Sequence, residues 1–134
     1  MSLVMRRIVP LAPTDAVDAL MGWFRARNGS PITFRHSYFG LSEPAVRPGS
    51  LEECRMNVQH HRSLAWRPTV LEIEIGPWSS SLTELDLRPL RWKMAPSEAY
   101  FAAGHALLDM LERGMAAHAA RRPVLRRRTG LGTG

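Results

Sequence analysis

The chain has 134 residues, of which 45% are hydrophobic and 22% are charged. This length and composition fit one globular domain with a single buried core. Cys54 is the only cysteine, which excludes an internal disulfide. No apolar run is long enough to span a bilayer, and the first residues lack the order of a signal peptide. We therefore expect a cytoplasmic protein without a membrane span.

The net charge of +6 belongs to the C-terminus rather than to the whole chain. The last fourteen residues contain no acid and carry five arginines, which are Arg121, Arg122, Arg126, Arg127 and Arg128. Without them, residues 1–120 carry a net charge of only +1. We therefore expect one domain over residues 1–120, followed by a basic, arginine-rich tail over residues 121–134.

The first predicted elements are a strand over Val4–Val9 and a helix that follows it. Thr14 is a suitable N-cap, and a single helical face recurs after it. That face consists of Val17, Leu20, Met21 and Phe24. The Asn28-Gly29 pair is typical of a helix C-terminus. The sequence therefore predicts a first helix of about four turns.

The segment Ile32–Phe39 alternates between two sets of side chains and predicts a second strand. Its inward set in this interpretation is Ile32, Phe34, His36 and Tyr38. The proline- and glycine-containing segment Gly40–Ser50 predicts a loop. The following segment, Leu51–Leu64, fits either a strand or the start of a short helix. The number of strands between Gly40 and Pro68 therefore stays open.

Two strongly alternating segments, Val70–Ile75 and Thr83–Leu87, predict an antiparallel hairpin. Their outward positions are acidic and would face one another: Glu72, Glu74, Glu84 and Asp86. Like charges opposite one another destabilise a sheet, so we expect arginines beside them. The candidates are Arg35, Arg67 and Arg88. A hard cation among the four acids is the alternative to this arginine-balanced outer face.

A long amphipathic helix is predicted from Ser97 to about Met115. Ser97 is a suitable N-cap, and the apolar residues that follow share one face of a helix. They are Phe101, Gly104, Leu108, Leu111 and Met115, with Leu107 and Met110 beside them. Pro123 is expected to stop any continuation.

These elements predict an α+β fold in the order strand, helix, several antiparallel strands and long C-terminal helix. We expect a curved antiparallel sheet that grips the C-terminal helix, because this helix has the longest apolar face available to cover the sheet.

The order of elements resembles the helix-grip fold of the START/Bet v 1 superfamily, which includes polyketide cyclases and aromatases. The likeness rests on Thr69–Met115, in particular the helical run Tyr100–Leu108, and on the strand-to-helix segment Pro10–Val17. Together these stretches cover roughly half of the chain. The resemblance implies a cavity between the sheet and the C-terminal helix that takes a small apolar ligand.

Our leading hypothesis is therefore a small apolar-ligand-binding protein of unknown ligand, with aromatic side chains lining the cavity. The candidate ligand-binding residues are Phe34, Tyr38, Tyr100, Phe101 and Leu108. The alternative for these aromatic residues is an ordinary place in the core. We expect neither a cofactor nor a metal, since the chain has no glycine-rich phosphate loop and no paired-cysteine zinc pattern.

Three alternatives remain open from the sequence. An enzyme like a polyketide cyclase or aromatase would need an inward histidine as a general acid or base, and the candidates are His36, His60 and His105. The arginine tail could instead make the protein an adaptor for nucleic acid or another anionic surface. An unpaired edge strand near Val4–Val9 or Ile32–Phe39 would also permit a homodimer.

Overall fold

The computed structural model describes residues 4–35, 37–62, 69–89 and 98–131. Within these ranges the chain forms seven strands and two helices. They are β1 (Met5–Val9), α1 (Pro13–Arg27), β2 (Ile32–Phe34), β3 (Ser37–Leu41), β4 (Ala45–Val46), β5 (Cys54–Arg62), β6 (Thr69–Pro77), β7 (Thr83–Pro89) and α2 (Glu98–Leu131).

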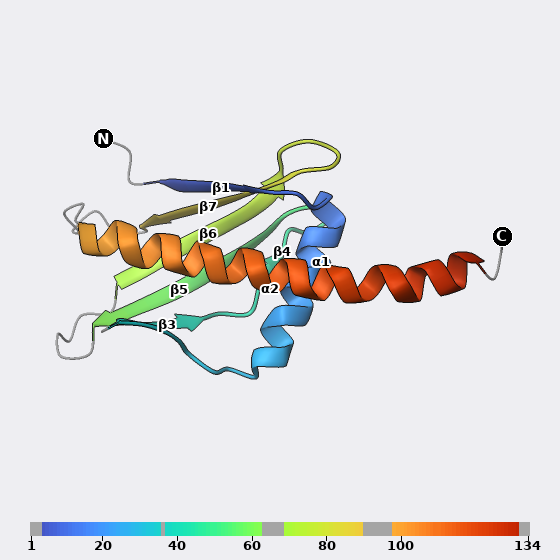
Figure 1. Ribbon diagram of the computed structural model, residues 1–134. Helices are drawn as coiled ribbons and strands as arrows, with labels where there is room; N and C mark the ends of the chain where they lie inside the picture. The colour runs from blue at the N-terminus through green and yellow to red at the C-terminus, as the bar shows by residue number, and fades with distance from the viewer. Residues whose placement is uncertain (1–3, 36, 63–68, 90–97, 132–134) are drawn as a thin grey trace.

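The strands form one antiparallel sheet in the order β1-β7-β6-β5-β3-β2, and β4 is an additional partner of β5. The sheet curls around α2, which runs across its concave face, while α1 covers one end (Figure 1). The predicted α+β class, with a curved sheet gripping the C-terminal helix, is confirmed. No helix in the described ranges is long and apolar enough to cross a membrane.

The core lies between α2 and the concave face of the sheet. The predicted apolar face of the helix is the one that is buried: Leu107, Leu108, Leu111 and Met115 are at most 1% exposed. Gly104 lies on the same face, and a Cβ atom there would collide with the side chains of Met5 and Leu87. The helix therefore approaches the sheet more closely at this turn than a larger residue would allow.

The two helices cross in direct contact next to this core. A Cβ atom on Gly114 of α2 would collide with the indole of Trp23 of α1, so the glycine makes room for the ring. The first helix ends at Asn28, which adopts the left-handed conformation with φ 51°. This ending confirms the predicted stop, although α1 begins at Pro13 with Ala12 as its N-cap rather than at Thr14.

The prediction of one strand over Ile32–Phe39 is wrong. The chain reverses at Arg35, whose φ of 53° is left-handed, and β2 pairs with β3 as a tight hairpin with Ile32 opposite Phe39. Phe39 is therefore the buried residue at 1% exposed, and Tyr38 is 42% exposed. The reversal exchanges the inward and outward sets of side chains beyond the turn.

The expected stop at Pro123 is also wrong, because α2 continues to Leu131. A proline inside a helix removes one backbone hydrogen bond and crowds the preceding turn, which costs about 3 kcal/mol. The residues on both sides of Pro123 are mostly alanine, leucine and arginine, which are among the best helix formers.

Candidate functional site

The middle of the interface between α2 and the sheet is filled by side chains. Leu108 is fully buried, and Gly104 has no room for a methyl group against the sheet. Gly114 has no room for one against Trp23 of α1. Leu108, a predicted ligand-binding residue, is therefore a core residue on the buried face of α2. At these two glycines the interface is as tight as an ordinary protein interior.

Three phenylalanine rings among the described residues pack on the edge of this core and are only partly buried: Phe24 of α1, Phe34 and Phe101. Phe34 ends β2, Phe101 lies in the first turn of α2, and both pack against the buried cluster. Strand β2 and helix α2 are in contact, and the first turn of α2 lies at the end of the molecule opposite α1 (Figure 1). The exposed guanidinium of Arg35 lies 5.1 Å from the centre of the Phe34 ring. The Phe34 ring therefore combines apolar surface with a nearby positive charge.

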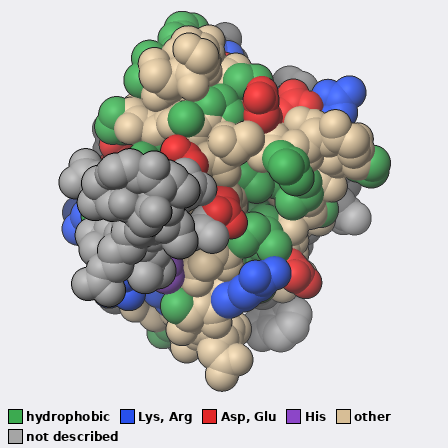
Figure 2. Space-filling view, turned by 90° about the vertical axis from the view of Figure 1, so that its right-hand side faces the viewer, with side chains coloured by type: hydrophobic (Ala, Val, Ile, Leu, Met, Phe, Trp, Pro, Cys, Tyr) green, Lys and Arg blue, Asp and Glu red, His purple; other side chains and the backbone are tan. Residues whose placement is uncertain are grey.

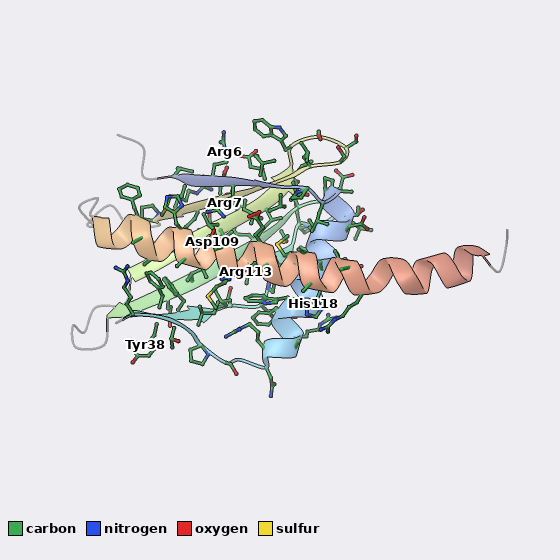
Figure 3. All side chains as sticks on the ribbon, viewed as in Figure 1. Arg6, Arg7, Tyr38, Asp109, Arg113 and His118 are labelled. Carbon is green, nitrogen blue, oxygen red and sulfur yellow. The ribbon has the colours of Figure 1, made fainter. Side chains whose placement is uncertain are left out.

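The other predicted site residues are exposed to solvent or lie outside the described part of the chain. Tyr38 is exposed and points away from α2, which corrects its predicted inward direction (Figure 3). His105 lies on the exposed side of α2. Residue His36 and the side chains of His60 and Tyr100 lie outside the described part of the chain. Of the candidate histidines, the structure therefore describes only the side chain of His105, and it faces solvent.

The outer face of the sheet carries the predicted acids, and arginines balance them. Arg88 donates to Glu72 at 2.9 Å and also contacts Glu74. Arg55 is 3.5 Å from each of these two carboxylates. The expected role of Arg88 is confirmed, Arg67 lies outside the described ranges, and Arg35 lies over Phe34 instead. Sequence reasoning missed Arg55, although its cross-strand position opposite Glu74 follows once the register is known.

A second cluster on this face joins Arg6 of β1 to Glu84 and Asp86 of β7. Arg6 Nε lies 2.7 Å from Glu84 and 3.0 Å from Asp86. The pKa of Glu84 is raised above its usual 4.5, chiefly by a hydrogen bond with Asp86 and then by burial and the charge of Asp86. The positive charge of Arg6 opposes this rise. The environment of Glu84 therefore favours the protonated form of this carboxyl group.

An open groove of about 740 Å³ lies on the outer face, between the β4 segment and strands β5 to β7. Its charged lining includes Arg47, Arg55, Glu74, Glu84 and Asp86. Sequence reasoning treated the β4 segment as a plain loop and so did not predict the groove. Within the described ranges, no group of three or more histidine, cysteine or acidic side chains could hold a metal ion.

Cys54 borders this groove but is not poised as a nucleophile. Its side chain is buried, and burial raises the pKa of the thiol from 9.0 to about 12. The thiolate form is therefore scarce at neutral pH. Most of the groove's charged groups are already paired with one another, so its described chemistry is that of a stabilised sheet surface.

An ion-pair cluster fastens α2 to the edge of the sheet. Arg7 of β1 lies 2.5 Å from Asp109 and 3.3 Å from Glu112, both on α2 (Figure 3). Arg7 shares its strand face with the buried residues Met5 and Val9. The cluster therefore stands at the rim of the core, where it fixes how the helix lies against β1.

Comparison with known proteins assigns neither a family nor an activity to the chain. No known protein family matches the sequence, and no curated protein sequence matches it. Among solved structures, the chain is similar to DynU16, a protein of the dynemicin biosynthetic locus, with a TM-score of 0.48 and 14% identity. The match covers 90% of this chain but 47% of DynU16, so the chain spans about half of that protein's length.

Proposed function

We propose that the protein binds a small apolar or aromatic molecule at the end of the sheet–helix interface marked by Phe34 and Phe101. The observation that carries this proposal is the partial exposure of both rings where they pack against the buried core. Aromatic rings that remain partly exposed beside a core offer apolar contact area to a flat ligand.

The packing of the rest of the interface supports this position. The turns of α2 around Gly104 and Gly114 are filled by the side chains of Met5, Leu87 and Trp23. A ligand under the middle of the helix would have to displace these side chains, and the free energy gained by burying each of them would be lost. The first turn of α2 is the part of its apolar face where a described aromatic ring is still partly exposed.

The position of Arg35 predicts the charge of the ligand. Its guanidinium is exposed and lies over the Phe34 ring. A ligand with an aromatic body and an acidic group would place its ring on the phenylalanines and its anion beside Arg35. We therefore expect an anionic aromatic ligand to bind more tightly than its neutral counterpart.

Two fluorescent probes test the proposal: N-phenylnaphthylamine, which is neutral, and anilinonaphthalene sulfonate, which adds a sulfonate to the same ring system. Phe101→Leu should weaken both probes by roughly three- to tenfold, because an aromatic contact contributes about 0.5 to 1.5 kcal/mol. Arg35→Gln should weaken only the anionic probe. Binding is followed by fluorescence titration of the full chain.

Phe24→Leu is the matched control. Phe24 is also a partly buried phenylalanine packed on the core, but it belongs to α1 at the other end of the molecule. Its substitution should leave both affinities unchanged, and thermal melts of all variants show whether each one is folded. Equal weakening by Phe24→Leu and Phe101→Leu in folded proteins would place the binding elsewhere and overturn the proposal.

A further inference from the structure

The whole positive charge excess of the protein lies in the part of α2 that follows Glu112. No acid follows Glu112, whereas six arginines do: Arg113, Arg121, Arg122, Arg126, Arg127 and Arg128. Residues 1–112 contain equal numbers of acidic and basic residues, so their net charge is zero. A neutral domain is therefore joined to a strongly basic helical segment.

The helix carries this charge away from the domain. Among the residues of α2 whose side chains the structure describes, which end at Arg121, Met115 is the last fully buried one, and Ala120 and Arg121 are exposed. Figure 1 shows α2 passing α1 and projecting beyond it toward the C-terminus. The backbone from Ala120 to Leu131 is helical, which corresponds to about 18 Å of projecting helix.

Arginines on the described domain surface are largely neutralised by neighbours. Arg6, Arg7, Arg47, Arg55 and Arg88 each form an ion pair with an acidic side chain. The end of the molecule from which α2 projects shows acidic, basic and hydrophobic side chains interspersed (Figure 2). On the described part of the domain surface, charges of both signs therefore lie side by side, whereas residues 120–131 include no acid.

We propose that the projecting end of α2, residues 120–131, binds duplex nucleic acid through its phosphate backbone. An α-helix fits the major groove of a duplex, and arginine pairs well with phosphate oxygens. A membrane surface fits less well. An interfacial helix needs an apolar face, and the only apolar residues other than alanine and proline here are Val124, Leu125 and Leu131.

The expected binding is insensitive to base sequence and sensitive to salt. Each phosphate contact releases counterions, so the affinity falls linearly with salt on logarithmic axes with a slope of about −0.9 per contact. Five arginines in residues 120–131 set an upper limit of about −4.5 for that slope. Binding of a duplex by residues 120–131 does not require a ligand at Phe34 and Phe101.

Fluorescence anisotropy of a labelled DNA duplex, titrated with the full chain at several salt concentrations, tests the inference. Changing Arg126, Arg127 and Arg128 together to Gln should weaken binding at least tenfold at low salt and reduce the slope by about 2 to 3. The matched control changes Arg25, Arg47 and Arg55 to Gln, which removes the same charge from the domain surface. It should lower the affinity only slightly and leave the slope near its original value.

Two results would overturn the proposal. One is an equal loss of affinity and slope in both triple variants, because net charge alone would then explain the binding. The other is binding to vesicles containing phosphatidylserine with no binding to the duplex at the same salt concentration, which would assign the helix to a membrane surface. Circular dichroism of each variant confirms that it is folded.

Discussion

Gly104 lies where α2 packs directly on the side chains of Met5 and Leu87, and its missing side chain is what permits the contact. The Cβ of any other residue would meet the side chains of Met5 and Leu87. Both neighbours are buried in the core, so neither can move freely to make room. This single position therefore determines how deeply the helix sits in the concave face.

Substitution of Gly104 tests this contact. Gly104→Ala should lower the free energy of unfolding by about 1 to 3 kcal/mol, because overpacking a filled core outweighs the gain in helix propensity. Urea denaturation gives the value. Gly40→Ala is the control, since nothing lies within 4 Å of its added Cβ. Equal stability of Gly104→Ala and the parent protein would show that the interface is looser than described.

The carboxyl pair on the outer face predicts a pH effect at Glu84. Its pKa in the folded protein is raised by the hydrogen bond and charge of Asp86, against the opposing effect of Arg6. A raised pKa means that the folded state holds the proton more tightly, so the associated stability is present at low pH and is lost as the pH rises through that pKa.

Glu84→Gln replaces the titrating group by a permanently neutral one. Its stability relative to the parent should therefore increase as the pH rises from about 4 toward neutral. The measurement is a series of urea denaturation curves for both proteins across this range. The change will be small, because Glu84 lies at a partly solvated surface. A relative stability that instead falls with rising pH would contradict the raised pKa of Glu84.

Among the elements, α2 has two parts with different sources of stability. The part up to Met115 is held by burial and by the ion pairs of Arg7 with Asp109 and Glu112. The part beyond Ala120 projects from the domain, so its helicity depends on local propensity. Pro123 lies in this second part and is its weakest position.

Pro123→Ala should therefore raise the helical content of the protein, because it restores a backbone hydrogen bond and removes about 3 kcal/mol of local cost. Far-UV circular dichroism measures the gain. Pro48→Ala, in an exposed turn outside any helix, should produce none. An unchanged spectrum for Pro123→Ala would mean that the proline does not limit the helix.

The same elements show what the sequence could and could not predict. The β6–β7 hairpin and the buried face of α2 follow from strict periods of two and 3.6 residues. The β2–β3 turn does not, because Arg35 adopts a left-handed conformation that usually marks glycine or asparagine. The alternation of apolar residues continues across this turn, which conceals the reversal.

Contacts that depend on which strands pair in the sheet could not be predicted from the sequence. Arg6 and Arg55 reach the acids only because β1 pairs with β7 and β5 pairs with β6. The outer groove likewise requires the two-residue strand β4 to pair with β5. Cross-strand neighbours are far apart in the chain, so periodicity in one strand does not identify them.

At the scale of the whole molecule, one helix links the proposed ligand site to the basic projection. Its first turn carries Phe101 beside the sheet, its middle is enclosed, and its end leaves the domain. The curved sheet and the Arg7 cluster hold the enclosed part in place. Binding at the first turn and binding at the last turns are therefore separable by substitution.

The contacts at Gly104 and Gly114 close the grip around the middle of α2, and we propose that a ligand binds at the Phe34 and Phe101 end. Amide NMR of the isotopically labelled protein during titration with N-phenylnaphthylamine tests it most directly. We predict that the chemical-shift changes concentrate in β2 and the first turns of α2. Changes that concentrate instead along the outer groove, at Arg47, Arg55 and Glu74, would contradict the claim.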